Sequence, residues 1–417
     1  MSTPLKTPPE ADTLRTIASN VGTPTYAYVE SIVRRQCERL RALVEGLPSR
    51  LLYAMKANAN PALLRIIRDE GFGLDVVSPG ELELALRVGF DPQDLLFSAS
   101  GMANDEMQHA VDAGVLPNIG SLSRLEAFGR MHSGQSVCVR VNPMIGAGHH
   151  EHVVTAGSAS KFGIPVSQMA EVMQCIRQYE LNLVGLHQHI GSGVHNLTEY
   201  RAALDVLLDV ARDIDGLAFI NVGGGLSTPQ HPDDLDLDAD AFREQVTRPL
   251  QRFTERYSGD LTIRLEPGRF LVAEAGVLLT QVHTHKKVGE RTIAITDTGM
   301  NHLIRPPLYD AYHTVYNLSN PEGALQTYDV VGNICESGDV IAKGRSVQSI
   351  EEGDILAVLD AGAYGIAMAS MYNLRPLPAE VLIRPDGTTE TVRPRQSPAD
   401  IADSILDDQR APELLGE

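Results

Sequence analysis

From about residue 26 to residue 282, short apolar segments alternate with amphipathic helical segments, and this alternation constrains the fold more than any other feature of the sequence. Strands that alternate with helices form parallel sheets, because each connecting helix packs back onto the sheet. Repeats of about 30 residues, eight in number, favour a closed (β/α)8 TIM-like barrel over an open doubly wound sheet. The predicted strands are Leu51–Ala54, Leu74–Val77, Leu95–Ser98, Leu116–Ile119, Val137–Val141, Leu183–His187, Phe219–Val222 and Thr262–Glu266. The predicted helices are Ala62–Asp69, Gly80–Val88, Asn104–Ala113, Ser121–Met131, Val166–Tyr179 and Leu197–Ile214.

After Val282 the helical periodicity ends, and strand-like runs separated by turn residues follow. We expect a barrel domain over residues 26–282 and a second, β-rich domain (a β-barrel or sandwich) over residues 283–417. Residues 1–25 are expected to pack on the second domain, and the strand-like segment Pro24–Val29 to pair with it. A helix is expected after Ala399. The predicted strands of the second domain are Thr292–Thr296, Thr327–Val331, Ile355–Leu359, Glu380–Ile383 and Thr388–Arg393.

The composition excludes several classes of partner. Lys and Arg number 35 against 54 Asp and Glu, which gives a net charge of −19 and argues against nucleic acid or an anionic membrane as a partner. No apolar run is long enough to span a bilayer, and Met1–Asp12 lacks the apolar core of a signal peptide. We expect a cytoplasmic protein with reduced thiols and without a zinc or disulfide framework. The four cysteines are widely spaced, at Cys37, Cys138, Cys175 and Cys335.

Lys56 ends the first predicted strand, in Tyr53-Ala54-Met55-Lys56-Ala57-Asn58. An ammonium group is strongly hydrated, so a lysine at the end of an apolar strand is costly unless it is paired or used chemically. A desolvated lysine can lose its proton and bond covalently to an aldehyde. Taken alone, such a lysine more often forms a salt bridge or extends to solvent. Barrels place their active sites at the carboxyl ends of their strands, and this makes Lys56 a candidate for carrying a cofactor.

Histidines and glycines follow two other predicted strands. His187 and His189 are separated by one residue and face the same side of a strand, which leaves a metal site open as an alternative, with further histidines at residues 149–152. Ser192 and its flanking glycines suit a phosphate better, because a hydroxyl and backbone N–H groups can donate to it. The run Gly223–Gly225 also allows close approach of an anion. It does not have the form of a dinucleotide-binding motif.

Carboxylates and an arginine complete the candidate residues of the barrel. Glu266 ends the last predicted strand and could keep a pyridinium nitrogen protonated, while Gly268 and Arg269 could contribute to a phosphate site. A buried Glu–Arg pair is the structural alternative. Asp75 lies at an apolar strand position and is a further candidate for cofactor binding, with a hydrogen-bonded core carboxylate as its alternative.

Three motifs lie in the predicted second domain, and each could also be a turn between strands. They are Arg305-Pro306-Pro307-Leu308-Tyr309, Cys335-Glu336-Ser337-Gly338-Asp339 and Asp360-Ala361-Gly362-Ala363-Tyr364-Gly365. Cys335 lies near Glu336 and Asp339, whose negative charges would keep the thiol protonated. The thiol is therefore better suited to donating a proton than to nucleophilic attack.

Seven motifs in order resemble the fold type III, pyridoxal-phosphate-dependent amino acid decarboxylases. They are YAMKAN, HIGSG, GGGL, EPGRF, RPPLY, CESGD and AGAYG, and the resemblance extends from about Thr23 to Leu382. The diaminopimelate-decarboxylating members are the most similar. The resemblance implies pyridoxal 5'-phosphate as cofactor and decarboxylation of meso-2,6-diaminopimelate to L-lysine and CO2, the last step of lysine biosynthesis.

The resemblance also implies a role for each motif. Lys56 bonds to the cofactor, His189 stacks on its ring and Glu266 pairs with the ring nitrogen. Cys335 donates a proton to the substrate carbon, and Cys335 and Glu336 come from the partner subunit of a homodimer with shared active sites. The residues implied around the cofactor phosphate are Ser192, Gly223, Gly224, Gly225, Gly268, Arg269 and Tyr364. Those implied for the amino acid substrate are Arg305, Tyr309 and Glu336, with Arg269 and Tyr364 as further candidates.

One segment departs from the family pattern. After the AGAYG motif the family has a Ser-Ser-Asn-Tyr-Asn-Ser-Arg-Pro-like run, and this chain has Ala369-Ser370-Met371-Tyr372-Asn373-Leu374-Arg375-Pro376. The change leaves open a relative that acts on another carboxylated diamino acid, in siderophore or antibiotic assembly. A racemase or cofactor carrier on the same barrel, a non-catalytic homologue and a metal-dependent barrel hydrolase are less favoured alternatives.

Overall fold

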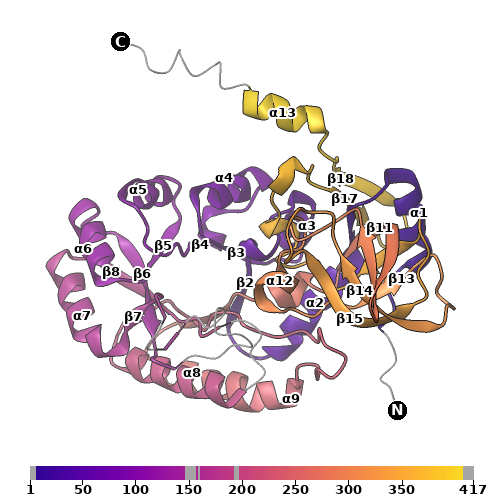
Figure 1. The fold of residues 1–417 in the computed structure, drawn as a ribbon. Helices are drawn as coiled ribbons and strands as arrows, with labels where there is room; N and C mark the ends of the chain where they lie inside the picture. The colour runs from indigo at the N-terminus through magenta and orange to yellow at the C-terminus, as the bar shows by residue number, and fades with distance from the viewer. Residues whose placement is uncertain (1–5, 146–155, 158–159, 192–196, 407–417) are drawn as a thin grey trace, which may run out of the picture. The chain divides into compact units, whose positions relative to one another are not determined.

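The computed structural model describes residues 6–145, 156–157, 160–191 and 197–406. The chain forms two compact units, which we call the barrel unit and the β unit (Figure 1). The barrel unit comprises residues 33–229 and 235–272, and the β unit comprises residues 1–32, 230–234 and 273–417. The expected boundaries, 26–282 and 283–417, differ from this division at both ends. Residues 26–32 and 273–282 belong to the β unit because the strands that contain them pair within its sheet.

The barrel unit contains a closed ring of eight parallel strands. The ring runs in the order β2, β3, β4, β5, β6, β8, β9, β10, and pairing of β10 with β2 closes it. The expected barrel is confirmed, as are all eight predicted strands, with ends that differ by at most two residues. The strands are β2 Ser49–Ala54, β3 Gly73–Val76, β4 Leu95–Phe97, β5 Leu116–Ile119, β6 Ser136–Asn142, β8 Asn182–His187, β9 Phe219–Asn221 and β10 Thr262–Leu265, and the short β7 Ile164–Pro165 pairs with β6.

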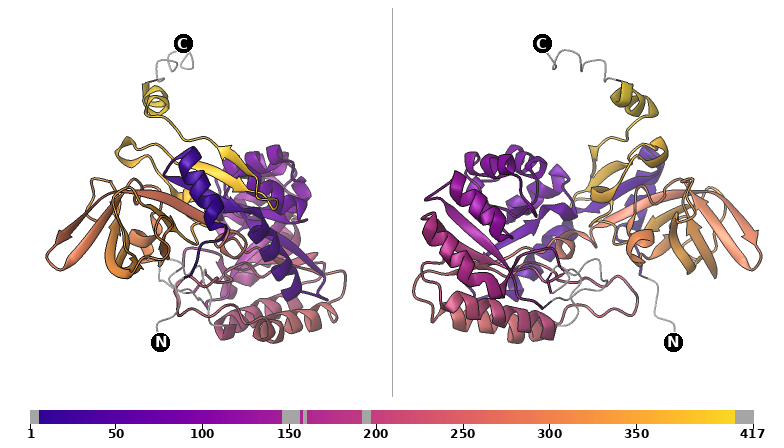
Figure 2. Two further views of the ribbon diagram at one scale, coloured as in Figure 1. Left: turned by 90° about the vertical axis from the view of Figure 1, so that its right-hand side faces the viewer. Right: turned by 60° about the vertical axis from the view of Figure 1, so that its left-hand side comes forward.

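Helices follow the strands and lie along the outside of the ring (Figure 2). Helix α3 illustrates why they form: Asn60 caps its first turn, Pro61 occupies the first helical position, and one face of the helix is buried. Ser78 and Ser121 cap α4 and α6 in the same way. The helices are α2 Glu30–Leu43, α3 Pro61–Asp69, α4 Pro79–Val88, α5 Asn104–Asp112, α6 Leu122–Met131, α7 Met169–Gln178, α8 Leu197–Arg212, α9 Ala239–Phe242, α10 Arg248–Thr254 and α11 Arg269–Val272.

Side chains from alternate strands fill the interior of the ring. Leu52, Leu96, Cys138 and Phe219 come from β2, β4, β6 and β9 and pack as one buried cluster. This is the layered arrangement by which small parallel barrels close their interior to solvent. A side chain at Gly185 would place its Cβ 2.2 Å from the Phe219 ring, so the aromatic ring requires glycine at that position.

The β unit is built on one mixed sheet in the order β15, β14, β12, β11, β1, β17, β18, with β16 paired to β11 and β13 paired to β16. Strand β1 is antiparallel to β11 and parallel to β17, which confirms that the first strand-like segment pairs with this unit. The strands are β1 Thr25–Val29, β11 Gly276–Val288, β12 Arg291–Thr296, β13 Val315–Asn317, β14 Leu325–Val331, β15 Val340–Gln348, β16 Ile355–Val358, β17 Ala379–Ile383 and β18 Thr389–Arg393. Its helices are α1 Ala11–Val21, α12 Arg305–Tyr309 and α13 Pro398–Leu406.

Three strands of the β unit, β11, β13 and β15, were not predicted, and two of them show why. Strand β11 crosses the expected domain boundary at Val282, and its second half is largely exposed and rich in His and Lys. Strand β15 carries Lys343, Gly344 and Arg345 at its centre, which interrupts the apolar alternation. In both cases the hydrogen-bonded neighbours stabilise a segment whose side chains give little strand signal. Among the described helices, none is both long enough and apolar enough to cross a membrane.

Candidate active site

Lys56 and Asp75 form an ion pair where β2 and β3 end. Lys56 lies in a single 3-10 turn, Met55–Ala57, directly after β2, and its Nζ is 3.2 Å from Oδ2 of Asp75. The side chain of Asp75 is 1% exposed, whereas that of Lys56 is 39% exposed. Burial raises the pKa of the Asp75 carboxyl, the charge of Glu266 adds to the rise and Lys56 opposes it. The pair therefore presents an accessible amine over a buried carboxyl group.

Glu266 is held by two side chains from neighbouring strands. Its Oε1 is 2.9 Å from Nε2 of His187, and its Oε2 accepts a hydrogen bond from Nδ2 of Asn221 at 2.8 Å. Burial alone would raise the pKa of Glu266, but His187, Lys56 and His189 outweigh it and lower the pKa to about 2. The carboxylate is therefore charged near neutral pH. Asn221 was not predicted from the sequence, and His187 was considered only as a metal ligand.

The ring of His189 is electrically neutral. The backbone N–H of Gly224 donates to its Nδ1 at 3.1 Å, so this nitrogen carries no proton. Burial lowers the pKa of His189 well below its ordinary value, and the positive charges of Lys56 and Arg140 lower it further. A flat, neutral ring thus lies within reach of the charged groups at the strand ends. Arg140, on β6, was also missed in the sequence analysis.

The glycines after β9 and β10 are required by close backbone packing. A Cβ on Gly223 would lie 2.5 Å from the carbonyl oxygen of Gln188, and one on Gly224 would lie 2.6 Å from that of Glu266. A Cβ on Gly268 would lie 2.9 Å from Cβ of Ala57, beside the turn that carries Lys56. These contacts bring the loops after β2, β8, β9 and β10 together.

Other predicted residues of the barrel unit lie nearby or outside the described part. Gly225 continues the same loop with φ of 91°, and Arg269 begins α11 with 6% exposure. Ser192 lies outside the described residues. Glu81 was not predicted; its Oε2 accepts from the Val77 N–H at 2.8 Å, while Ser78 caps the Glu81 N–H. This capping pair fixes α4 at the end of β3.

In the β unit, Arg305 is the largest fully buried side chain, with 1% exposure at the start of α12. Its Nη1 is 3.3 Å from Nε2 of His313 and its Nη2 donates to Oε1 of Gln230 at 3.2 Å. His313 in turn contacts the carbonyl oxygen of Leu359 through Nδ1 at 2.8 Å. His313 and Gln230 therefore help to orient the guanidinium. Tyr309 is the last residue of α12 and is half-buried.

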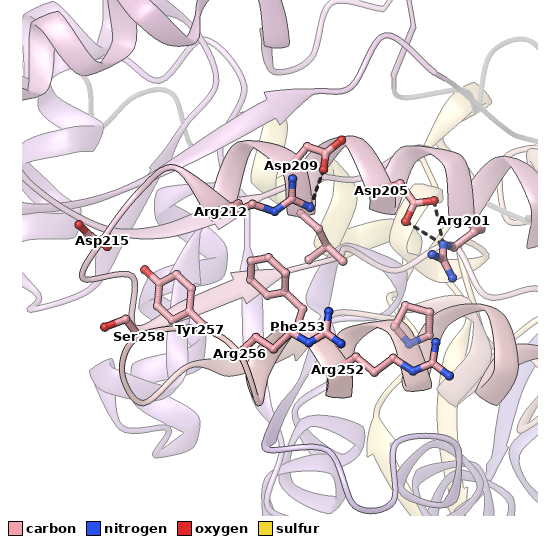
Figure 3. A pocket seen from close by; sticks show the side chains of 12 residues that line it. Arg201, Asp205, Asp209, Arg212, Asp215, Arg252, Phe253, Arg256, Tyr257 and Ser258 are labelled. Carbon is pink, nitrogen blue, oxygen red and sulfur yellow. Dashed lines mark hydrogen bonds and ion pairs between the residues drawn. The ribbon is translucent and has the colours of Figure 1, made fainter.

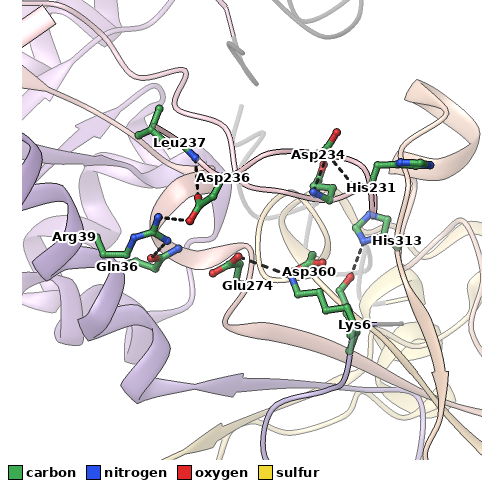
Figure 4. Close-up of polar contacts among 12 residues, drawn as sticks. Lys6, Gln36, Arg39, His231, Asp234, Asp236, Leu237, Glu274, His313 and Asp360 are labelled. Carbon is green, nitrogen blue, oxygen red and sulfur yellow. Dashed lines mark hydrogen bonds and ion pairs between the residues drawn. The ribbon is translucent and has the colours of Figure 1, made fainter. Parts of the chain in front are cut away.

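The loop that carries Tyr364 begins at Asp360, a buried carboxylate that pairs with Lys6. Nζ of Lys6 is 2.6 Å from Oδ1 of Asp360 and 3.8 Å from Oε1 of Glu274 (Figure 4). Burial raises the pKa of Asp360 to about 6 although Lys6 opposes the rise. Asp360 and Tyr364 both have φ of 57°, so the loop turns sharply at each. The start of the chain thus fixes the turn that precedes Tyr364.

Cys335 is exposed, whereas Cys37, Cys138 and Cys175 are buried, and all four are free thiols. Oδ1 of Asn373 accepts a hydrogen bond from the Cys335 N–H at 2.8 Å. The loop that departs from the family pattern is therefore bound to the backbone of the cysteine. Its Leu374 side chain is 61% exposed.

Asp339, which the sequence suggested as a neighbour of the Cys335 thiol, instead binds backbone N–H groups. Asp339 is 4% exposed, and its carboxylate accepts from the backbone N–H groups of Met300 at 2.6 Å and Ile334 at 2.8 Å. These two hydrogen bonds hold the loop that carries Cys335 in place. Glu336 is exposed on the same loop, and its Oε1 accepts from the Gly338 N–H at 3.3 Å.

A metal site finds no support among the described residues, where no three His, Cys, Asp or Glu side chains are placed to hold an ion. His149, His150 and His152 lie outside the described residues. The residues at the barrel strand ends have instead the composition of a site for an organic cofactor: an accessible amine, a carboxylate that is charged near neutral pH, a neutral imidazole and glycine-rich loops.

Comparison with known proteins identifies the family. Residues 30–273 match the family described as pyridoxal-dependent decarboxylase, pyridoxal binding domain. The diaminopimelate decarboxylase of Methanothermobacter thermautotrophicus is 40% identical over 395 residues, which cover 92% of each chain, and that of Aquifex aeolicus is 34% identical over 409 residues, 95% of each. The structure of diaminopimelate decarboxylase from Helicobacter pylori complexed with L-lysine has a TM-score of 0.87 at 30% identity, covering 95% of this chain and 100% of that one. The chain therefore belongs to the pyridoxal-dependent decarboxylase family, and it is similar to diaminopimelate decarboxylases along nearly its whole length.

Proposed function

We propose that this protein decarboxylates meso-2,6-diaminopimelate at its D-centre to give L-lysine and CO2, with pyridoxal 5'-phosphate as cofactor. The observation that carries the proposal is the pairing of Lys56 with Asp75 and of Glu266 with His187 and Asn221 at the strand ends of one barrel. The named relatives support the substrate, and the family match supports the cofactor.

The residues at the strand ends fit this cofactor. Lys56 offers an accessible amine for its aldehyde, and Glu266, which is charged near neutral pH, suits a protonated ring nitrogen. The neutral ring of His189 can stack on a flat heterocycle without charge repulsion. The candidates for its phosphate are Ser192, Gly223, Gly224, Gly225, Gly268, Arg269 and Tyr364. When bound, the cofactor supplies an acceptor for the electron pair left behind by CO2.

Asp75 is the candidate for accepting the proton that Lys56 loses. An amine must be uncharged to attack an aldehyde, and the ammonium form of Lys56 lies 3.2 Å from the Asp75 carboxyl. Because Asp75 is buried and its pKa is raised, it is a better proton acceptor than an exposed aspartate. We assign Lys56 as the cofactor-binding lysine and Asp75 as the group that receives its proton.

Arg305 and Glu336 are the candidates for recognising the distal L-centre of the substrate, which carries one carboxylate and one ammonium group. His313 and Gln230 orient the Arg305 guanidinium, which is buried. A buried and oriented guanidinium group binds a carboxylate strongly. Tyr309, Arg269 and Tyr364 complete the proposed substrate contacts.

Cys335 is the candidate for returning a proton to the α-carbon, and we propose that it acts in the active site of a second copy of the chain. Cys335 is exposed on a loop of the β unit that Asp339 holds in place, which suits a group that is presented to another subunit. The protein would then be a homodimer with shared active sites.

Mixing two inactive variants tests the shared site. Lys56→Ala and Cys335→Ala chains should reassort into hybrids with one native and one doubly altered site. Activity should return to about a quarter of wild type if half the dimers are hybrids. If subunit exchange is verified and no activity returns, each site is built within one chain.

The substrate is tested by measuring CO2 release from a panel of amino acids led by meso-diaminopimelate, with lysine, ornithine and LL-diaminopimelate as controls. We expect the highest kcat/KM for the meso compound. A higher value for another carboxylated diamino acid would favour the alternative substrate class, for which the exposed Leu374 beside the Cys335 loop is the supporting observation.

A further inference from the structure

A cavity of about 800 Å3 lies at the opposite end of the barrel from Lys56. Residues at the beginning of three strands line it: Ser49 starts β2, Thr262 starts β10 and Ala218 directly precedes β9. This floor cavity is distinct from the strand ends that carry the candidate active site. Arg50 and Arg264 also line it.

Arg264 forms no ion pair within the described part of the chain, and its Nε is buried and makes no hydrogen bond. Its guanidinium carbon lies 3.7 Å from the centre of the Phe219 ring, which belongs to the buried layer of the barrel. Burial lowers the pKa of Arg264 and the charge of Arg50 acts in the same direction, whereas Cys138 and Glu266 oppose them. The guanidinium therefore remains charged with no carboxylate in direct contact.

Arg50 increases the excess of positive charge. It lies directly opposite Arg264 in the register of the parallel strands β2 and β10. Like charges at facing positions of neighbouring strands repel each other. Arg50 forms an ion pair with Asp94, whereas Arg264 forms none among the described residues.

The other charges around the floor cavity do not correct this imbalance. Glu70 is already paired with Arg34 and Arg41, of which Arg41 also lines the cavity. Glu45 lines the cavity as well, but it is exposed and forms no ion pair with Arg264. A negatively charged ligand would balance the excess of positive charge around the cavity.

A second cavity on the outside of the barrel unit has a different character. It has a volume of about 560 Å3 and lies beside α8 and α10 (Figure 3). There Arg201 pairs with Asp205, and Arg212 pairs with Asp209. Arg252 and Arg256 are exposed to solvent, which screens their charge. The floor cavity differs because its unmatched arginine is packed against an aromatic ring inside the barrel.

We propose that the floor cavity is a binding site for a small oxyanion, a phosphate or a carboxylate, held by the guanidinium groups of Arg264 and Arg50. Both groups present several N–H donors, and paired donors of this kind recognise planar carboxylates and phosphates. The hydroxyl groups of Ser49 and Thr262 line the same cavity and can donate further hydrogen bonds. Binding there would stabilise the folded barrel by mass action.

Equilibrium dialysis tests the site with the cofactor-loaded protein, so that any site for the cofactor phosphate is already filled. Radiolabelled inorganic phosphate should bind saturably, with one equivalent per chain beyond the cofactor, at constant ionic strength. Competition by succinate would show that the site also binds carboxylates. If succinate does not compete, the site is specific for phosphate. Arg264→Gln should weaken phosphate binding at least about tenfold.

Controls separate the site from general charge effects. Arg87→Gln removes an exposed arginine of the same unit that pairs with Glu83, and it should leave phosphate binding unchanged. Arg50→Gln provides a second variant should Arg264→Gln not fold, and it should also weaken binding. The melting temperature of the wild type should rise with phosphate, and that of a folded Arg264→Gln protein should not. The absence of saturable binding to the wild type, or retention of its affinity in the Arg264→Gln and Arg50→Gln variants, would overturn the proposal.

Discussion

Replacing Glu266 with glutamine should destabilise the barrel unit by about 3 kcal/mol near neutral pH. Glutamine has the shape of protonated glutamate, so the substitution costs about as much as protonating the native carboxyl group. Burial alone would raise the pKa of Glu266, but His187, Lys56 and His189 together lower it from 4.5 to about 2. Each pKa unit corresponds to about 1.4 kcal/mol, which gives a cost of about 3 kcal/mol.

The pH dependence of this cost has a defined sign. Because the folded pKa lies below the unfolded value, the stabilisation is fully present above about pH 4.5 and is lost as the pH falls toward about 2. The difference between wild type and Glu266→Gln should therefore be constant between pH 5 and pH 7, and should shrink below about pH 4.5.

Urea unfolding of the cofactor-free proteins measures the difference, with circular dichroism as the probe. The sequence has no tryptophan, so tyrosine fluorescence serves as the second probe. Glu255→Gln is the matched control, because Glu255 is exposed at the end of α10, and it should change stability by less than about 0.5 kcal/mol. A loss of less than about 1 kcal/mol for Glu266→Gln at pH 7 would refute the reasoning.

Three further predictions concern the proposed roles of single residues. Borohydride treatment of the yellow protein should attach the cofactor irreversibly to Lys56, and peptide mapping that finds Lys56 unmodified would contradict the assignment. Arg305→Ala should lower kcat/KM on meso-diaminopimelate by a factor that corresponds to about 2–4 kcal/mol, since a substrate carboxylate would lose its buried partner. An unchanged kcat/KM would show that Arg305 is not part of the site. Asn373→Ala should free the Cys335 backbone, lower kcat severalfold and change the pH profile of Cys335 labelling by a thiol reagent, with the exposed Ser337→Ala as control. Unchanged labelling and kcat would show that Asn373 does not position the thiol.

The barrel could be predicted because its eight strands are short apolar runs at regular spacing, and each run is buried on both faces. Lys56 and Glu266 could be predicted for the same reason, since a charged residue at the end of such a run is conspicuous. Strand β15 could not, because Lys343 and Arg345 break its apolar pattern and its stability comes from pairing with β14.

The residues that surround the charged groups could not be predicted without the register of the strands. Asn221 and Arg140 are single polar residues in apolar strands, and only the closed ring shows that both face the same interior as Glu266. Counting every second residue back from the strand ends would have found them. The hydrogen bonds of Asp339 could not be predicted, because proximity in sequence does not show where a carboxylate points. Its two backbone donors come from Ile334 and from the distant Met300.

The place of β1 in its sheet bears on how the chain is made. All five residues of β1 are buried, and its partners β11 and β17 begin only at Gly276 and Ala379. During synthesis the whole barrel unit emerges between them and can fold first. Until β11 follows, the apolar strand Thr25–Val29 has both edges open to other chains. Slow translation of residues 33–272, or release of an incomplete chain, would therefore favour aggregation through this strand.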